Sequence, residues 1–520
     1  MAKVIIDPVT RIGGHMSIEL QVDGGFVTDA WCSGEMFRGL ERIFTGRDPL
    51  DAVQLSQRIC GVCPVPHGIA SSMCLESAFG MKPSAGGRVI RNLMLGANFL
   101  HSHLLHFYQM AALDYADITA LDRYRGGDGR LEKLKSWLGN ERQIRTGMED
   151  AVTIGSPFLP RYEGDFYLKD QALNIEVLSG YVRSLELLIK SHAMISALGG
   201  RAPHAMGLTP GGVTQAPTRA LLRNFRKNLK EVGKFITGSY YPQVEAVAAA
   251  FKDYFKIGGF ANFMSCGLFD PEEGGSFFLQ PGIAVDTRTG EFDPGRLREE
   301  VRFARYGSAS NLHPRDGRTE PDPGKAGAYS WIKAPRYDGR PMEVGPLARL
   351  VVAYLGGNAL VRDSVDTLLR ELRQDLPALF SVFGRHVARA VEAKMIAARM
   401  REWLDDFEVG GSHRNNFEMP AAGEGGGLIE APRGTLGHWM IIKDRKIAGY
   451  QAVVPTAWSC GPRDDRGTRG PVEQALIGTP VSDPMNPIEA ARVVRSFDPC
   501  VMCAVHVVEG GRRISGMKVC

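Results

Sequence analysis

Apolar and polar residues alternate along the first 32 residues of the chain, and a helical pattern replaces this alternation from about residue 50. The alternation is interrupted by Gly24-Gly25 and predicts a β-hairpin or small sheet at the N-terminus. Farther along, apolar residues recur at spacings of three and four, as in helices with one buried face. This spacing predicts helices over 67–79, 88–120, 169–198, 219–255 and about 363–407.

Two stretches of the chain lack the helical spacing. Residues 256–345 are rich in Gly, Pro, Asp and Arg, and residues 410–462 return to turns and short strands. These stretches predict strands and long loops around a helical body. We find no internal repeat and no dividing linker, so we expect one intertwined unit over residues 1–520. The predicted fold class is mainly α with smaller β portions (α+β), a long-helix core with peripheral strands and loops.

The composition is that of an ordinary globular protein, 44% hydrophobic and 23% charged. A formal net charge of +4 without a dense basic block argues against nucleic acid as a partner. The chain opens with a strand-like stretch, so we expect no export signal there. No apolar run reaches the roughly 18 residues that a membrane span needs. A location at a membrane or in the periplasm therefore requires a carrier.

Four of the nine cysteines form two Cys-x-x-Cys pairs near opposite ends of the chain, Cys60/Cys63 and Cys500/Cys503. The odd number and wide scatter of the cysteines do not indicate a disulfide framework. Gly61 allows a tight backbone turn, so both sulfurs of the first pair can face one point. Four converging thiolates suit a soft or borderline transition metal, and we expect both chain ends to meet at a buried metal site.

The identity of the metal stays open from spacing. Two such pairs are most typical of a structural zinc site, with an iron–sulfur cluster as the second possibility. Structural zinc pairs usually lie within a few tens of residues, because the metal holds a small module together. Here nearly the whole chain separates the pairs, and His67 and Asp498 beside them suggest proton chemistry.

Taken together, the motifs resemble the large subunit of nickel–iron hydrogenases, in particular the membrane-associated uptake type. The resemblance covers essentially the full chain and rests on several separate segments. They are Asp7-Pro8-Val9-Thr10-Arg11-Ile12, Arg38-Gly39-Leu40-Glu41, residues 58–67, Ala202-Pro203-His204, Ala431-Pro432-Arg433-Gly434, Pro455-Thr456-Ala457-Trp458 and residues 498–506.

The resemblance implies reversible heterolytic cleavage of dihydrogen to protons and electrons. It implies a nickel held by Cys60, Cys63, Cys500 and Cys503, with Cys63 and Cys503 bridging to an iron that carries cyanide and carbon monoxide. The chain lacks cysteines for a series of electron-relay clusters. The family's iron–sulfur small subunit supplies those clusters.

The resemblance also assigns roles to four residues around the metals. Arg433 orients dihydrogen or acts as a base, and Asp498 pairs with it. Thr456 hydrogen-bonds a cyanide, and His67 hydrogen-bonds a cysteine sulfur. Outside this context, an Arg or Asp in a loop is usually a surface charge, and a Thr after Pro is usually a turn residue.

A second metal site follows from the same resemblance. Glu41 and His506 match family ligands of a magnesium ion, for which carboxylate oxygens and waters are the usual donors. By itself Glu41 fits a solvated helix position. His101, His103 and His106 do not share one helical face, so we expect them to pack or to hydrogen-bond.

The sequence departs from the family at Gly13, where members commonly carry a Glu that takes the first proton from a cysteine sulfur. We hypothesise that a water chain or another acid, such as Glu19 or Glu35, replaces it. In this family a maturation endopeptidase also removes a tail after the His that matches His506. Residues 507–520 are therefore expected to be a cleaved propeptide.

The expected location is periplasmic, with membrane association through partner subunits, and the alternative is cytoplasmic. The twin-arginine signal of the small subunit would carry both subunits across the membrane, and a membrane cytochrome is a further candidate partner. A rival hypothesis is a non-catalytic hydrogen sensor or a structural zinc protein.

Overall fold

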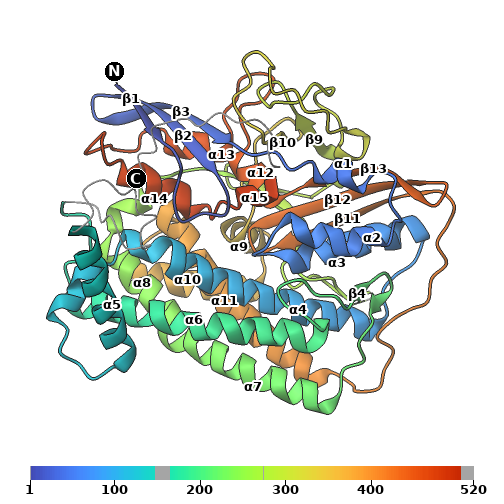
Figure 1. Cartoon of the computed structure of the whole chain (residues 1–520), viewed down its shortest axis with the longest axis horizontal. Helices are drawn as coiled ribbons and strands as arrows, with labels where there is room; N and C mark the ends of the chain where they lie inside the picture. Colours follow the sequence, from blue (N-terminus) through green and yellow to red (C-terminus); the bar gives the residue numbers. More distant parts are fainter. Residues whose placement is uncertain (1, 147–163, 273, 505–520) are drawn as a thin grey trace.

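Long helices form the body of the protein, whose computed structural model describes residues 2–146, 164–272 and 274–504. The longer helices are α3 (Pro64–Phe79), α4 (Ala85–Leu104), α5 (Gly129–Thr146), α6 (Gln171–Gly199), α7 (Arg219–Phe235), α8 (Tyr241–Ala250), α9 (Pro346–Leu355), α10 (Ala359–Leu372) and α11 (Val382–Asp406). α4 packs against α6 and α11, and α6 packs against α7, across the lower half of Figure 1. The expected long-helix core is confirmed.

Short helices lie near both ends of the chain. They are α1 (Leu40–Phe44), α2 (Asp51–Ser56), α12 (Pro455–Cys460), α13 (Pro471–Leu476), α14 (Ile488–Ser496) and α15 (Val501–Ala504). α3 begins with Pro64 in its first turn and ends before Gly80, whose φ of 66° suits a residue without Cβ. The helices predicted over 67–79 and 169–198 correspond to α3 and α6.

Three of the predicted helices are not single α-helices. The stretch 88–120 leaves α4 at Leu104 for a π-helical turn (Leu105–Ala111), and 219–255 is broken by a π-helical turn (Ile236–Tyr240). The stretch 363–407 is two helices, because Arg373 adopts a left-handed φ of 55° after α10. Ser381 then caps α11 by accepting a hydrogen bond from the Gly384 amide.

Two antiparallel three-stranded sheets frame the helical body. The N-terminal sheet contains β1 (Ala2–Ile6), β2 (Met16–Asp23) and β3 (Phe26–Gly34), and the second contains β11 (Gly423–Ala431), β12 (Gly434–Lys443) and β13 (Lys446–Val453). Gly24 and Gly25 form the β2–β3 turn with φ of 58° and 83°, so the predicted hairpin is confirmed.

The loop-rich stretch 256–345 carries only short strands, as its composition predicts. Small antiparallel pairings join β6 (Asn262–Ser265), β7 (Gly282–Val285) and β8 (Arg288–Gly290), and join β9 (Leu297–Glu300) to β10 (Ala334–Tyr337). A further pair is β4 (Leu208–Thr209) with β5 (Gly212–Val213). With the helical body, these sheets make an α+β fold.

The two ends of the chain meet next to β1–β3. Gly13 donates a backbone hydrogen bond to Pro499 O at 3.1 Å, and Gly13 O accepts one from Met502 N at 3.0 Å. Figure 1 shows the N-terminal sheet beside α14 and α15. This bridge brings Cys500 from near the end of the chain into the interior.

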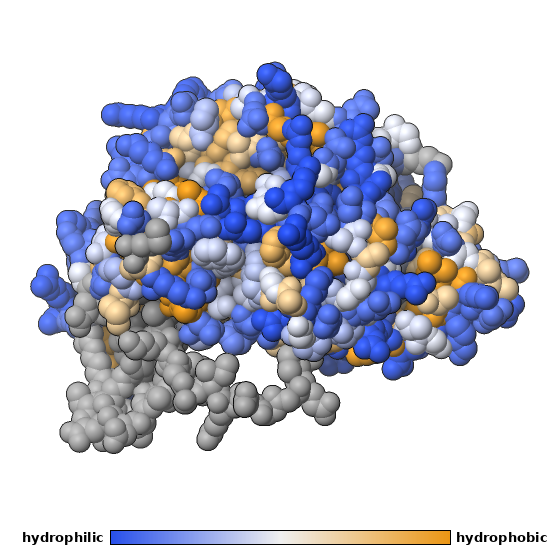
Figure 2. All heavy atoms as spheres, turned by 90° about the horizontal axis from the view of Figure 1, so that it is seen from above, coloured by the Kyte–Doolittle hydropathy of each residue, from blue (hydrophilic) through white to orange (hydrophobic). Residues whose placement is uncertain are grey.

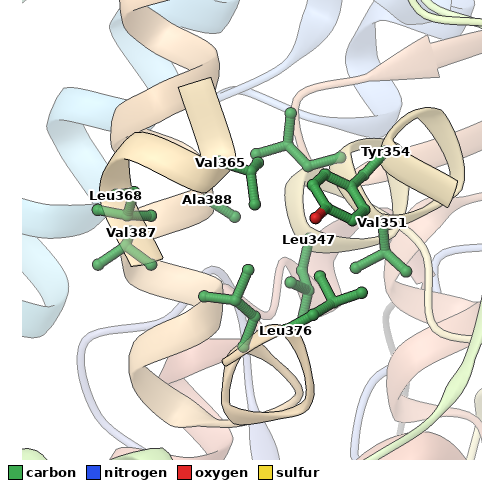
Figure 3. Close-up of a pocket in the computed structure, with 10 residues that line it drawn as sticks. Leu347, Val351, Tyr354, Val365, Leu368, Leu376, Val387 and Ala388 are labelled. Carbon is green, nitrogen blue, oxygen red and sulfur yellow. The ribbon is translucent and has the colours of Figure 1, made fainter. Parts of the chain in front are cut away.

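A small apolar void of about 10 Å³ lies between α9, α10 and α11 (Figure 3). A space of this size holds about one water molecule, and an apolar lining gives a water no partners. The residues labelled around it are Leu347, Val351, Tyr354, Val365, Leu368, Leu376, Val387 and Ala388. The void is therefore a minor packing defect in the helical layer.

The surface is mixed in character. On the face shown in Figure 2, hydrophilic side chains surround smaller groups of apolar ones. Within the described ranges, no helix combines the length and the apolar character needed to cross a bilayer.

Candidate metal centre

The first cysteine pair lies where a loop enters α3. Cys63 is the residue that precedes the first turn of α3, and Cys60 is extended, with φ of −136°. The Cys60 sulfur accepts hydrogen bonds from the amides of Val62 at 3.3 Å and Cys63 at 3.2 Å. Such N–H donors and the helix N-terminus stabilise a thiolate. The loop therefore favours the charged form that binds metals.

Cys500 brings a third sulfur to the same place from the other end of the chain. Cys500 Sγ lies 3.4 Å from Cys60 Sγ, and Cys63 Sγ lies 3.1 Å from Cys60 Sγ. All three cysteines are almost completely buried. The fourth predicted ligand, Cys503, belongs to α15, but its side chain lies outside the described residues.

The sulfur–sulfur distances exclude a disulfide and leave room for the sulfurs to move apart around a metal. They exceed the about 2.05 Å of a disulfide and fall short of the about 3.8 Å that metal–sulfur bonds of about 2.3 Å give in a tetrahedron. Accordingly, no three His, Cys, Asp or Glu side chains within the described parts of residues 2–504 are already arranged around an ion. A small outward movement of the sulfurs, by about half an ångström, would admit one.

Arg433 lies in the turn between β11 and β12 and is held by Asp498. Its Nε donates to Asp498 O at 3.0 Å, and its Nη2 donates to Asp498 Oδ1 at 2.9 Å. Burial lowers the pKa of Arg433, but the negative charges of Asp498 and Cys500 outweigh burial and hold that pKa well above its ordinary value. Arg433 Nη1 is buried and has no hydrogen-bond partner among the described residues. A fixed cation with an unused donor thus lies beside the sulfurs.

Thr456 supports the cysteine loop from α12. Its hydroxyl oxygen accepts a hydrogen bond from the Cys500 amide at 3.0 Å, and the residue is buried. The hydroxyl proton is not used by this bond and can serve another acceptor.

His67 lies in α3 but contacts a different partner from the predicted one. Its Nδ1 is 3.1 Å from His438 Nε2, and His438 Nδ1 is 2.6 Å from the Tyr450 hydroxyl. Burial lowers the pKa of His67 to about 4, so the ring is neutral at pH 7. Its Nε2 has no partner among the described residues, which include no hydrogen bond from His67 to a sulfur. His438 gave no sequence signal, because a single His in a strand carries no motif.

Glu41 lies at the floor of a cavity of about 470 Å³. Its Oε1 accepts a hydrogen bond from the Ala452 amide at 3.1 Å, and its Oε2 accepts one from the Thr319 hydroxyl. Close by, Lys333 Nζ contacts Gln451 Oε1 at 2.8 Å and Glu299 at 3.2 Å. The second predicted magnesium ligand, His506, lies outside the described residues.

The polar residues around Glu41 were missed from the sequence. Glu299, Thr319 and Lys333 come from the loop-rich stretch, whose composition suggests solvent exposure, yet all three are buried. Only burial in the fold distinguishes them from surface residues.

His101, His103 and His106, in and just after α4, pack or form hydrogen bonds, as expected. His103 Nε2 lies 2.7 Å from Glu392 Oε2, and His106 Nε2 lies 2.7 Å from Arg495 O. The ring of His101 stacks on that of His192 at 4.2 Å.

The hypothesised substitutes for a carboxylate at Gly13 have other partners. Glu35 accepts a hydrogen bond from Ser17 at 2.7 Å, and the partly exposed Glu19 forms a salt bridge with Lys3 at 2.8 Å. Neither carboxylate hydrogen-bonds to Cys500 within the part of the chain that the structure describes. Their role in proton transfer stays a prediction.

Comparisons with known proteins cover nearly the whole chain. Residues 38–506 match the family described as nickel-dependent hydrogenase, and residues 3–32 match the one described as HoxL-like. The periplasmic [NiFeSe] hydrogenase large subunit of Desulfomicrobium baculatum is 41% identical over 97% of this chain and 95% of its own length. The hydrogenase-2 large chain of Escherichia coli strain K12 is 32% identical over 99% of both chains.

The fold is also shared with solved structures. The Ni-Fe-Se hydrogenase from D. vulgaris Hildenborough in the reduced state superposes with a TM-score of 0.85, at 39% identity, over 97% of this chain and 100% of the other. Identity and coverage at this level leave no room for a different fold or family. The chain belongs to the nickel-dependent hydrogenase large-subunit family.

Proposed function

We propose that this chain is the catalytic subunit of a nickel–iron hydrogenase, which splits dihydrogen reversibly and heterolytically and passes electrons to an iron–sulfur small subunit. One observation carries the proposal furthest. Thiols from opposite ends of the chain converge in the buried interior, next to an ion-paired arginine with an unused donor.

The four cysteines would hold the nickel, with Cys63 and Cys503 bridging to an iron that carries cyanide and carbon monoxide. When bound, this centre polarises dihydrogen and takes up its electrons. The chain supplies thiolates that backbone amides stabilise, in a pocket from which water is excluded.

Arg433 would orient dihydrogen over the open side of the metals. Asp498 fixes the guanidinium through two hydrogen bonds, so the Nη1 donor keeps one direction. Thr456 fixes the Cys500 backbone, and its free hydroxyl proton suits a cyanide. α3 holds His67 near the first cysteine pair, and the neutral His67 ring can accept or donate one hydrogen bond at Nε2.

Metal analysis of the purified complex tests the centre. We expect nickel, together with more iron than the clusters of the small subunit account for, and we expect Cys500→Ser to lose nickel together with dye-linked hydrogen oxidation. Cys266→Ser is the matched control, since this buried cysteine lies near Glu430 and away from the other sulfurs. Zinc in place of nickel and iron would contradict the proposal.

We also propose that Glu41 and His506 bind magnesium together with waters. The cavity above Glu41 has room for waters, and Gln451 and Thr319 supply further oxygens. Glu41→Ala should lower the magnesium content of desalted protein. Glu320→Ala changes an exposed carboxylate on the same cavity and should retain it. Equal magnesium in both variants would overturn this site.

Residues 507–520 are proposed to be a propeptide that a maturation endopeptidase removes. Intact-mass measurement of the active protein should show a chain that ends at His506. A fully active chain that still ends at Cys520 would refute the proposal.

The proposed location is the periplasm, with membrane association through partner subunits. Named relatives include a periplasmic large subunit and a quinone-reactive hydrogenase large chain. Cell fractionation with and without a membrane cytochrome partner tests this, and activity confined to the cytoplasm would contradict it.

A further inference from the structure

Helix α3 lies on strand β11 with backbone against backbone, as Figure 1 shows for the two elements. A Cβ added to Gly425 would lie 1.9 Å from Cys74 O, and one added to Gly427 would lie 2.1 Å from Ala70 O. Atoms at such distances overlap, and the obstacle is helix backbone, which no rotamer change can move aside. Both positions therefore require glycine.

The contact has a regular register. Residues 423, 425 and 427 alternate along one face of β11, and they face residues 78, 74 and 70 of α3. Two strand residues span about 6.7 Å and four helix residues span about 6 Å, so the two repeats nearly match. The Cys74 thiol adds a hydrogen bond to Gly425 O at 3.1 Å. The helix is thereby fixed in depth and along its length.

α3 and β11 run in opposite directions, so that the start of α3 and the end of β11 both lie at the metal centre. Cys63 precedes the first turn of α3, and Arg433 follows the last residues of β11. At this end His67 of α3 contacts His438, which pairs with Gly427 across the sheet. α3 thus carries the first cysteine pair, and the β11–β12 turn carries the arginine.

A second observation indicates that both elements present groups to a ligand there. His67 Nε2 and Arg433 Nη1 are buried and have no hydrogen-bond partner among the described residues. Buried donors and acceptors are normally paired, so these two atoms are open to a further hydrogen-bonding group.

We propose that Gly425 and Gly427 are positioning residues for the reaction. They set the depth at which α3 lies on β11, and so fix the spacing between the Cys60/Cys63 sulfurs and Arg433. This inference rests on the proposed function of these residues. A methyl group at either position would push α3 away by about 1 Å, a displacement that can cost on the order of 100-fold in rate when it misplaces reacting groups.

The test compares Gly425→Ala and Gly427→Ala with Gly426→Ala in the complete enzyme complex. Gly426 belongs to the same strand, but its added Cβ points to the other face. It would lie 3.2 Å from the Trp439 ring, which borders a cavity, and 4.0 Å from His438 O. For the first two variants we expect kcat to fall roughly 10- to 100-fold with an unchanged KM for dihydrogen. Their nickel and iron contents should stay, and the infrared bands of the iron ligands should shift. Gly426→Ala should match the wild type in all four measurements.

If Gly425→Ala and Gly427→Ala do not fold, Gly423→Ala is tested in their place. Its Cβ would lie 3.0 Å from Ala78 O, a milder overlap at the far end of the same contact. A smaller fall in kcat with a smaller band shift supports the inference. Wild-type kcat and bands in any of the three variants that fold overturn it. A wild-type enzyme without nickel, iron or these bands would instead overturn the proposed function itself.

Discussion

Gly13 packs directly against Cys500, and the two residues form a backbone bridge. A Cβ at this position would lie 3.0 Å from Cys500 Sγ and 3.3 Å from Cys500 Cα. Real Cβ contacts are rarely so short, so the sulfur would have to move by a few tenths of an ångström. The absence of the family's glutamate therefore removes a carboxylate and leaves room for the Cys500 sulfur, the proposed metal ligand.

Gly13→Ala should lower hydrogen oxidation by roughly tenfold, because it displaces a ligand without adding a carboxylate. Gly127→Ala, in an exposed loop before α5, is its control, since a Cβ there meets no atom within 4 Å. The measurement is dye-linked turnover together with the nickel content of each variant. Equal activity of Gly13→Ala and wild type would show that the Cys500 sulfur accommodates the added methyl group without loss of function.

Gly13→Glu is then compared with Gly13→Ala, so that the displacement of the sulfur is common to both. If a carboxylate at residue 13 speeds proton transfer, hydrogen–deuterium exchange should be faster in the Glu variant. Identical exchange in the two variants would mean that the missing glutamate does not limit this enzyme.

The buried side chain of Glu473 in α13 predicts a pH dependence of stability. Burial raises its pKa to about 7, against the hydrogen bonds from the Cys32 amide and the Tyr329 hydroxyl. The folded state therefore holds a proton that the unfolded chain releases near pH 4.5. The contribution of this proton to the free energy of unfolding is present in full below pH 4.5 and is lost as the pH rises through about 7.

Glu473→Gln should remove this pH-dependent loss of folding stability. Between pH 5 and pH 8 the free energy of unfolding should shift in favour of the Gln variant by about 2–3 kcal/mol. Urea unfolding of both proteins at the two pH values measures the shift. A constant difference between the proteins would contradict the raised pKa.

At this scale the cysteines could be predicted and several of their neighbours could not. Cys60, Cys63 and Cys500 stand in a spaced motif, which carries chemical meaning before any fold is known. His438 and Lys333 stand singly in strands or loops. The position of His438 beside His67 and that of Lys333 near Glu41 depend on long-range packing that spacing does not record.

Among the elements, the helices were predicted best where strong caps enclose an amphipathic run. Asp170 accepts hydrogen bonds from the amides of Ala172 and Leu173 at the start of α6, and Gly200 ends that helix with φ of 75°. The break between α10 and α11 was missed because apolar spacing continues through it. Pro377 and Ser381 mark the break in the sequence, but the left-handed turn at Arg373 has no such marker.

Asp170→Ala should lower the free energy of unfolding by about 1 kcal/mol, because two amides in the first turn of α6 lose their acceptor. Lys169→Ala, one residue earlier and exposed, should change it little. Urea unfolding measures both, and turnover of each should equal that of the wild type. A loss no larger than that of the control would mean that water replaces the cap.

In the whole molecule, the position of the cysteine pairs at opposite ends of the chain predicted that both ends meet. The bridge between Gly13 and Cys500 is the contact that joins them. The class of fold followed from long apolar periodicities. The order of strands in the small sheets of the described residues did not, because such short strands leave little pattern.

The infrared spectrum of the purified complex tests the central claim most directly. Carbon monoxide and cyanide bound to iron absorb in a region where protein groups do not. We predict sharp bands for both ligands, which shift when dihydrogen is added and are lost in Cys500→Ser. A nickel-containing, active complex whose spectrum has no such bands would contradict a nickel–iron centre with these ligands.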